Sequence, residues 1–327
     1  MPEVIDKTLL AVEELKVHYE VGGRFGTRIG SRSLRAVDGV TLEVKAGECL
    51  GLVGESGCGK STLALAIMGL VTPTSGRINV GGQAIGKDHK PDRESMARAV
   101  QMVFQDPYAS LNPRQTVHRT LADPLRLHGM GNKTEVEHRV ADMLAKVGLR
   151  PEHASRYPHE FSGGQRQRIG IARALILGPR LVICDEPVSA LDVSIRAQII
   201  NLLLDLKEQL GLSYIMISHD LGVVEHMSDR VAVMYLGRLV ETGPWQEIFE
   251  NPRHPYTRAL IASIPDPFLP ASLQAQKARG EIASALNPPP GCHFHPRCPM
   301  KQDRCVAEMP LLRTVTSGHN AACHFAI

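Results

Sequence analysis

The sequence lacks a long apolar run. No stretch of 18 or more apolar residues occurs among its 327 residues, so it predicts no membrane-spanning helix. The first residues, Met1 to Asp6, contain neither a basic nor an apolar segment. We therefore expect no secretory signal and a chain that stays in the cytoplasm. A formal net charge of only +3 is too small to indicate nucleic acid binding by itself.

Cysteine is scarce over most of the chain, because four of the seven cysteines lie at or after position 292. Disulfides are rare in the cytoplasm, so we expect free thiols or metal ligands rather than crosslinks. The remaining composition, 43% hydrophobic and 22% charged, is that of a globular protein with one large or two modest domains.

A phosphate-binding loop is the strongest motif in the chain. Residues 54–61, GESGCGKS, fit the pattern G-x4-G-K-[ST], between a predicted strand over 48–53 and a predicted helix over 62–70. The glycines let backbone N–H groups turn toward a phosphate chain, and the helix N-terminus favours its charge. Lys60 would reach the β and γ phosphates and Ser61 would hold Mg²⁺. The alternative is a glycine-rich turn without a ligand. The expected ATP contacts are Gly54, Ser56, Gly57, Cys58, Gly59, Lys60, Ser61 and Thr62.

Polar side chains follow three further apolar runs that predict buried strands, at 100–104, 181–184 and 214–218. Ligands bind at such strand ends in open α/β sheets. Asp185 suits Mg²⁺, and Glu186 can polarise a water for attack on the γ-phosphate. Gln105 can ligate Mg²⁺ or orient water, but it can equally cap a strand. His219 can bond the γ-phosphate or be structural. Tyr19, late in a predicted strand, can stack on a base or pack on the core.

Residues from about 106 to 165 predict a helical subdomain inserted into the core. Helical apolar spacing occurs over 134–147, and three dipeptides predict turns. Those dipeptides are Asp106-Pro107, Asn112-Pro113 and Asp123-Pro124. The segment ends at Ser162-Gly163-Gly164-Gln165, before a predicted helix over 166–177. Free N–H groups and a serine hydroxyl at a helix start form a candidate anion site, with a plain N-cap as the alternative.

The alternation of apolar runs and helical segments predicts an α/β fold. We expect a mostly parallel sheet with helices on both faces, because that is how strand–helix alternation packs. Two strand patterns, over 9–20 and 34–44, precede the phosphate loop as antiparallel β elements. A helix over 193–210 and a hairpin over 231–241 complete the core.

Together these motifs resemble those of the ATP-binding cassette (ABC) ATPases. The phosphate loop, Gln105, the family's S-G-G-Q at 162–165, the Asp185-Glu186 pair, S-A-L-D at 189–192 and His219 occur in the family's order. The resemblance implies a P-loop NTPase (RecA-like) core. It also implies that Tyr19 stacks on the base, that Glu186 is the catalytic base, and that Gln105 and His219 assist it. Ser189 and Asp192 correspond to the family's D-loop.

The family's architecture implies a partner for this cassette. Ser162, Gly163, Gly164 and Gln165 would complete the ATP site of a second cassette, with two ATP molecules between the subunits. Because this chain contains one cassette, we expect a second ATPase subunit, a paralogue forming a heterodimer. Closure on ATP and opening after hydrolysis would act on membrane partners through the helical subdomain.

The cassette is assigned to residues 1–250 and a C-terminal extension to 251–327. N-P-R-H-P-Y-T-R-A-L at 251–260 and N-P-P-P-G-C at 287–292 resemble the extension of peptide importer ATPases. This resemblance implies ATP-driven uptake of di- and oligopeptides, with the chain peripheral on the cytoplasmic side of the inner membrane. Two permease subunits and a periplasmic or extracellular peptide-binding protein are the implied partners. The alternatives are an importer of nickel or another solute, or a soluble ABC ATPase acting on nucleic acid, a partner we do not expect.

The extension contains a candidate metal site. Cys292, Cys298, Cys305 and Cys323 follow the spacing C-x5-C-x6-C-x17-C. Four thiolates in one short segment could ligate a [4Fe–4S] cluster or a zinc ion. The spacing lacks the paired C-x2-C units usual for structural zinc. Relatives with this extension carry the iron–sulfur cluster, so the resemblance favours it, with zinc and unligated thiols as the alternatives.

Overall fold

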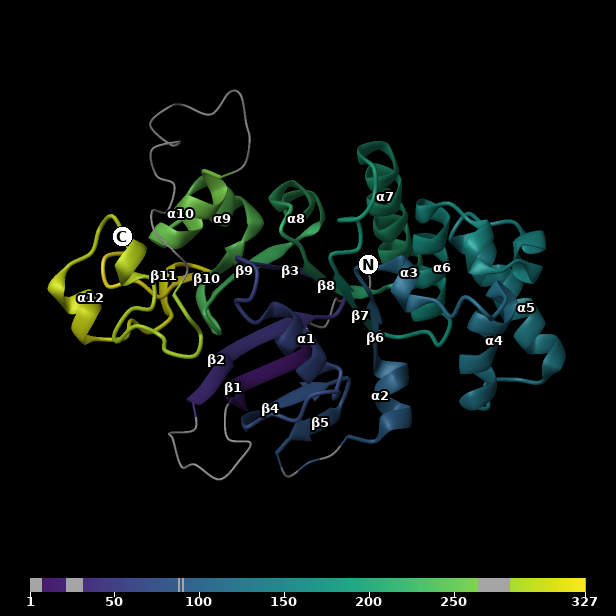
Figure 1. Ribbon diagram of the computed structural model, residues 1–327, viewed down its shortest axis with the longest axis horizontal. Coiled ribbons are helices and arrows are strands. Elements are labelled where there is room, and N and C mark those ends of the chain that lie inside the picture. The colour runs from purple at the N-terminus through teal and green to yellow at the C-terminus, as the bar shows by residue number, and fades with distance from the viewer. Residues whose placement is uncertain (1–7, 22–31, 88, 90, 264–282, 327) are drawn as a thin grey trace.

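The computed structural model describes residues 8–21, 32–87, 89, 91–263 and 283–326. Among them, eight strands form one sheet in the order β11-β12-β10-β9-β3-β8-β7-β6. Strands β9, β3, β8, β7 and β6 run parallel to one another, whereas β10 pairs antiparallel with β9. Their bounds are Arg230–Tyr235, Cys49–Val53, Ser213–Ile217, Leu181–Asp185 and Val100–Val103. The predicted α/β fold with a mostly parallel core is confirmed (Figure 1).

Both faces of the core sheet are covered, as a parallel sheet requires. Alternate residues of each strand point to opposite faces. Leu181 and Ile215 pack with α1 (Lys60–Ile67) and the N-terminal strands, whereas Val182 and Tyr214 pack on the opposite side. That opposite side is covered by α6 (Gly163–Leu175), α7 (Val193–Leu210) and α8 (Leu221–Met227). The nearly continuous apolar strands of the sequence thus reflect burial from two directions.

A second, antiparallel sheet lies beside the core in the order β2-β1-β4-β5. The bounds are Arg32–Lys45, Thr8–Val21, Ser75–Val80 and Gln83–Gly86. Helix α2 (Arg93–Ala99) then leads into β6. Figure 1 shows this sheet below the core, next to α1. The antiparallel elements expected at the N-terminus are therefore present.

The inserted helical subdomain lies at the end of the molecule opposite the C-terminus (Figure 1). It contains α3 (Pro107–Ser110), α4 (Val117–Leu127) and α5 (Lys133–Lys146), followed by 3-10 turns at Pro151–Ser155 and Pro158–Glu160. The turn predicted at Asp123-Pro124 is wrong, because Pro124 lies inside α4.

The reason for this error is tertiary packing. Val117, Leu121 and Leu125 recur at a spacing of four and are completely buried. Their burial contributes roughly 1.5–3 kcal/mol each, which together outweighs the roughly 3 kcal/mol cost of a proline inside a helix. A dipeptide rule that considers only local backbone preference cannot detect that balance.

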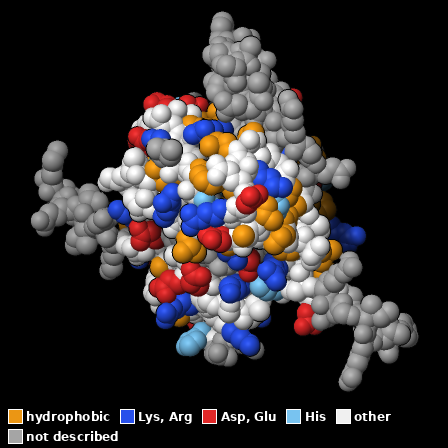
Figure 2. All heavy atoms as spheres, turned by 90° about the vertical axis from the view of Figure 1, so that its left-hand side faces the viewer, with side chains coloured by type: hydrophobic (Ala, Val, Ile, Leu, Met, Phe, Trp, Pro, Cys, Tyr) orange, Lys and Arg blue, Asp and Glu red, His pale blue; other side chains and the backbone are white. Residues whose placement is uncertain are grey.

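The C-terminal segment packs on the edge of the core sheet rather than forming a separate body. Strand β12 (His319–Ala321) pairs antiparallel with β10 (Arg238–Pro244), and β11 (Arg313–Thr316) pairs with β12. Helix α9 (Trp245–Glu250) follows β10 and precedes the segment, which begins at residue 251. Helices α10 (Pro255–Ile261) and α12 (Asp303–Ala307) and the turn η3 (His295–Arg297) complete the segment. Figure 2 views the molecule from this side and shows apolar side chains between charged ones.

A buried carboxylate joins the segment to the core. Glu241 of β10 is fully buried and accepts the backbone N–H groups of Arg253 at 2.6 Å and His254 at 2.9 Å. Its Oε1 also lies 2.7 Å from Nε2 of His319, which is equally buried. One side chain thereby fixes the start of α10 and strand β12 at the same time.

Replacing Glu241 with alanine should lower the free energy of unfolding by about 3–5 kcal/mol, because two backbone donors and a buried imidazole would lose their partner. Thermal or denaturant unfolding of the purified chain measures this loss. Glu247→Ala is the matched control, since Glu247 is 42% exposed and 3.7 Å from Nδ1 of His319. A loss as small as that of the control would show that Glu241 does not anchor the segment.

Candidate functional site

The phosphate loop runs from β3 into α1 and has a backbone that only glycine accommodates at two points. Gly54 has φ 152° and Gly59 has φ 110°. A Cβ at Gly54 would lie 2.2 Å from the carbonyl oxygen of Met234, and one at Gly59 would lie 2.0 Å from that of Ala36. The loop is therefore packed directly against the backbone of two other strands.

Lys60 is held inside the loop that it belongs to. Its Nζ donates to the carbonyl oxygens of Gly54 at 2.7 Å and Glu55 at 3.1 Å, and lies 3.6 Å from Sγ of Cys58. The side chain is buried, and the Cys58 thiol beneath the loop has a pKa raised by burial. Carbonyl oxygens hold the ammonium at the position from which it can contact a bound anion.

A cavity of about 510 Å³ opens in front of this loop. Most of the predicted site residues line it, namely Tyr19, Ser56, Gly57, Gly59, Lys60, Ser61, Thr62, Gln105, Asp185, Glu186 and His219. Ala285 of the C-terminal segment and Ile217 also line it, and no pattern in the sequence pointed to either. A cationic loop at one wall and carboxylates at the other suit a polyphosphate with its metal ion.

Glu186 is the residue on which three sequence motifs converge. Gln105 Nε2 donates to its Oε2 at 2.8 Å, and His219 Nδ1 lies 3.1 Å from its Oε1. Ser189 Oγ donates to its backbone oxygen at 3.1 Å. Glu186 itself has φ 47°, a left-handed conformation that costs a non-glycine residue of order 1 kcal/mol. This turn directs its carboxylate into the cavity beside Asp185.

Asp185 lies at the carboxyl end of β7 and lines the cavity together with Ser61, which acts to lower the pKa of its carboxyl group. Burial raises the pKa of its carboxyl group above the ordinary value, and the neighbouring Glu186 adds to the effect. A carboxylate whose charge is penalised in this way is one that a divalent cation would stabilise. The Asp185–Ser61 pair therefore suits a metal ion beside bound phosphates.

The S-G-G-Q segment lies away from this cavity, at the N-terminus of α6. Ser162 Oγ accepts the N–H of Gln165 at 3.4 Å, and Gln165 Oε1 accepts the N–H of Ser162 at 3.1 Å. The helix begins at Gly163, three residues earlier than predicted, with Ser162 as its N-cap. A Cβ at Gly164 would lie 2.5 Å from Cγ2 of Ile195, so glycine permits the close approach of α6 and α7. Asp192, the N-cap residue of α7, also lies outside the cavity lining.

The four cysteines of the C-terminal segment line one small cavity, together with Phe294, His295 and Phe325. All four are free thiols, and burial, assisted by the neighbouring thiols, raises the pKa of Cys292 to about 11. Within the described residues, no group of three or more His, Cys, Asp or Glu side chains is arranged to hold a metal ion. The donor set fits a metal or cluster, whereas the present spacing of the side chains does not.

A contact that the sequence did not reveal joins the C-terminal segment to the phosphate loop. Arg297 forms a bidentate ion pair with Glu55, the second residue of the loop. Its two terminal nitrogens lie 2.8 and 2.9 Å from the carboxylate oxygens of Glu55. Tyr256 accepts the backbone N–H of Glu55 at 2.8 Å. Because 242 residues separate Glu55 from Arg297, no local pattern could have found this pair.

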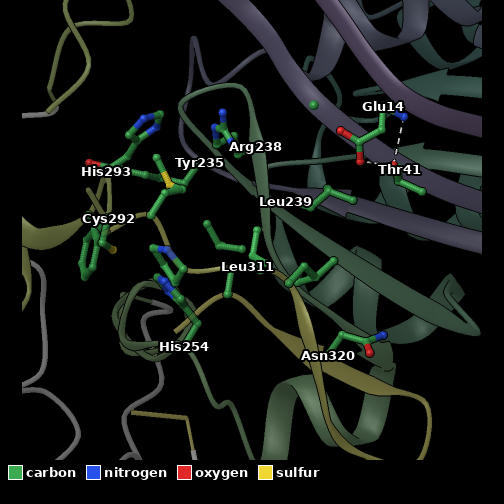
Figure 3. Close-up of a pocket in the computed structure, with 17 residues that line it drawn as sticks. Glu14, Thr41, Tyr235, Arg238, Leu239, His254, Cys292, His293, Leu311 and Asn320 are labelled. Atoms are coloured by element: carbon green, nitrogen blue, oxygen red, sulfur yellow. Dashed lines mark hydrogen bonds between the residues drawn. The ribbon is translucent and has the colours of Figure 1, made fainter. Parts of the chain in front are cut away.

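A second cavity, of about 520 Å³, lies between the C-terminal segment and the N-terminal strands. Figure 3 shows His254, Cys292 and His293 on one side of it and Glu14 with Thr41 on the other. None of the predicted ATP contacts lines this space. The segment and the N-terminal strands therefore leave a space between them at this point.

Two parts of the chain match known protein families. Residues 37–189 match the family described as ABC transporter, and residues 240–305 match the one described as oligopeptide/dipeptide transporter, C-terminal region. The chain is 53% identical over 97% of its length to the oligopeptide transport ATP-binding protein OppF of Escherichia coli K12, covering 96% of that protein. It is 49% identical to the di/tripeptide transport ATP-binding protein DppF of Pseudomonas aeruginosa, covering 98% of both chains.

Two solved structures of ABC proteins resemble this chain over about three quarters of its length. One neighbour is cbiO1 from Clostridium perfringens, part of an ABC transporter complex, with a TM-score of 0.63 and 29% identity over 75% of this chain and 91% of that one. Another is a dimeric ATP-binding cassette in a post-hydrolysis state with ADP and phosphate bound. It has a TM-score of 0.62 and 27% identity over 72% of this chain and 98% of that one. In the described part of this chain, no helix is long and apolar enough to cross a membrane.

Asp185→Asn should raise the thermal unfolding midpoint of the nucleotide-free chain at neutral pH. The wild-type pKa is raised, so the folded chain is penalised for the charge at high pH, and the penalty fades as the pH falls through that pKa. The gain should therefore shrink in acid. Unfolding scans across pH measure it, and Asp205→Asn, on the exposed face of α7, is the control. A gain that does not depend on pH would contradict this assignment of the charge penalty.

Proposed function

Because the chain belongs to the ATP-binding subunits of ABC transporters, we propose that it hydrolyses ATP to power the uptake of di- and oligopeptides. The observation that carries the ATPase part is the meeting of Lys60, Asp185 and Glu186 at one cavity. The cargo assignment is supported by the match of residues 240–305 to the peptide transporter C-terminal region and by the peptide transport relatives. No feature of the site favours nickel or nucleic acid.

We assign the steps of hydrolysis to residues of the cavity. Lys60 and the loop N–H groups would bind the β and γ phosphates, and Tyr19 would stack on the base. Ser61, Gln105 and Asp185 would hold Mg²⁺, which supplies charge neutralisation between the phosphates. Glu186, fixed by Gln105 and His219, would accept the proton of the attacking water.

A second ATPase subunit is needed for the S-G-G-Q segment to act. Ser162 to Gln165 lie outside the cavity of their own chain, at the N-terminus of α6, where Ser162 is exposed. We propose that they contact the triphosphate bound by a partner cassette, where their N–H groups would bind the γ-phosphate. Ser189 and Asp192 would lie at the same interface. A paralogue is the proposed partner, which would make the pair a heterodimer.

The remaining partners follow from the importer function. We propose two permease subunits in the inner membrane, with this chain attached peripherally on the cytoplasmic side, and a peptide-binding protein outside. In this assignment residues 1–250 form the nucleotide-binding domain and 251–327 the C-terminal extension. The helical subdomain, which lies far from the C-terminal segment, is the proposed contact with the permeases (Figure 1).

We further propose that Cys292, Cys298, Cys305 and Cys323 hold a [4Fe–4S] cluster, with zinc as the alternative. Four free thiols around one cavity are a donor set for either. Because no described group of side chains is yet arranged to hold a metal ion, loading would require these thiols to move together. Such a cluster would brace the turns and short elements that carry the four cysteines.

An importer assembled in vesicles with its permease and partner ATPase subunits should accumulate labelled short peptides when ATP is supplied. Glu186→Gln should reduce ATP hydrolysis by about a hundredfold or more, because the general base is lost while the phosphate contacts remain. Bound ATP should persist in this variant, as measured by filter retention of labelled nucleotide.

Two outcomes would count against this assignment. Near-normal hydrolysis by Glu186→Gln would remove Glu186 from the role of base. Accumulation of Ni²⁺ but not of peptides would replace the cargo and leave the ATPase assignment intact. Glu208→Gln, a charge change on the exposed end of α7, is the matched control and should hydrolyse ATP at the wild-type rate.

Anaerobically purified chain should be brown, with about four iron and four sulfide per chain, as expected for one [4Fe–4S] cluster. Metal analysis and the visible absorption spectrum measure this content. Cys298→Ser should abolish or sharply reduce it, while Cys49→Ser, at a core cysteine outside the segment, should not. A colourless preparation that contains stoichiometric zinc would establish the alternative metal.

A further inference from the structure

Glu55 is held from three directions, and two of the groups that hold it come from the C-terminal segment. Its carboxylate receives both terminal nitrogens of Arg297 at 2.8 and 2.9 Å. Its backbone N–H donates to the hydroxyl of Tyr256 at 2.8 Å. Its carbonyl oxygen accepts Nζ of Lys60 at 3.1 Å. Glu55, which holds Lys60, is thus itself held by the C-terminal segment, in which Tyr256 lies 201 residues further along the chain.

The two residues from the C-terminal segment rest on a rigid aromatic base. Tyr235, Tyr256 and Phe294 are each about 1% exposed, with ring centroids 4.6 to 5.4 Å apart. The guanidinium of Arg297 lies 5.8 Å from the centre of the Phe294 ring, and its side chain is only 7% exposed. Side chains packed this closely have few alternative rotamers, so they can fix the position of what they bind.

The electrostatics favour a permanent pair. The hydrogen bonds that Arg297 donates to Glu55 raise the pKa of Arg297 above its already high value, so the guanidinium remains charged. Burial raises the pKa of Tyr256 further above neutral, so the hydroxyl that accepts the Glu55 N–H carries no charge. A bidentate pair between a guanidinium and a carboxylate, largely shielded from water, is among the strongest of side-chain contacts.

We propose that Arg297 and Tyr256 are positioning residues for ATP binding, which act through Glu55. They fix the carbonyl that holds Lys60, and Arg297 neutralises a carboxylate that would otherwise place a negative charge in the phosphate loop. The C-terminal segment thereby contributes to nucleotide affinity as well as to the architecture of the sheet. This inference rests on the proposed ATP-binding function and assigns a role to residues outside the cassette motifs.

The test is a cycle of nucleotide affinities on the full-length chain, measured by titration with a fluorescent ATP analogue. Arg297→Gln should weaken binding about tenfold, or about 1.4 kcal/mol, because it leaves the Glu55 carboxylate unpaired beside the phosphates. Glu55→Gln should cost less than about threefold, since both groups remain able to hydrogen-bond. Arg297→Gln with Glu55→Gln should recover to within about threefold of the wild type, because the unpaired charge is gone.

Several controls separate positioning from general damage. Arg304→Gln is matched to Arg297→Gln, because Arg304 also directly precedes a cysteine, but its ion pair with Glu308 is exposed. It should leave the affinity unchanged. Tyr256→Phe retains the ring and removes only the acceptor of the Glu55 N–H, and should weaken binding about threefold even if Arg297→Gln fails to fold. In the assembled importer, Arg297→Gln should raise the KM for ATP about tenfold and change kcat less than twofold.

Affinity of Arg297→Gln and Tyr256→Phe within twofold of the wild type would overturn the proposal. So would losses in the double variant that equal the sum of the single losses. A wild-type chain that binds no nucleotide, or that binds equally well after Lys60→Ala, would instead overturn the proposed function. Binding that depends on Lys60 but not on Arg297 leaves the ATPase assignment standing and removes the positioning role alone.

Discussion

The parallel register of β3, β8 and β7 is the constraint on which the nucleotide site depends. Gly51 and Cys184 both pair with Met216, so the three strands end at one edge of the sheet. The loop after β3 and the polar residues after β7 and β8 therefore meet at one cavity although they are far apart in sequence. A slip of one residue would turn each of these side chains to the opposite face.

The C-terminal segment is attached to the core sheet and to the nucleotide site. It is attached to the sheet by the pairing of β12 with β10, to the core by the buried carboxylate of Glu241, and to the phosphate loop through Glu55. Two of these attachments are made by glutamate side chains with little or no exposure to solvent, which makes them specific in geometry. The segment and the nucleotide site are thus parts of one packed unit. A structural change in one of them therefore alters contacts that the other depends on.

Local patterns predicted what one strand–loop–helix unit contains, and they failed where distant parts meet. The phosphate loop and the Asp185-Glu186 edge were predicted because each follows from a short run of residues. The turn at Pro124 was predicted wrongly because the burial of α4 overrides the backbone preference of proline. Strand β5 and helix α2 were not predicted because each is short and has few apolar residues. The Arg297–Glu55 pair depends on how the C-terminal segment folds back onto the core, which no window of sequence contains.

The hairpin β11–β12 also determines which strand forms the edge of the large sheet on the side opposite β6. The backbone groups on the outer side of that strand are unpaired. Without it, the outer strand would be β10, whose residues are mostly buried. With it, the outer strand is β11, which is four residues long, mostly exposed and starts at an arginine. Short, polar border strands discourage pairing with other molecules. By covering the edge of β10, the extension therefore protects the cassette against aggregation through strand pairing. This protection requires neither nucleotide nor metal.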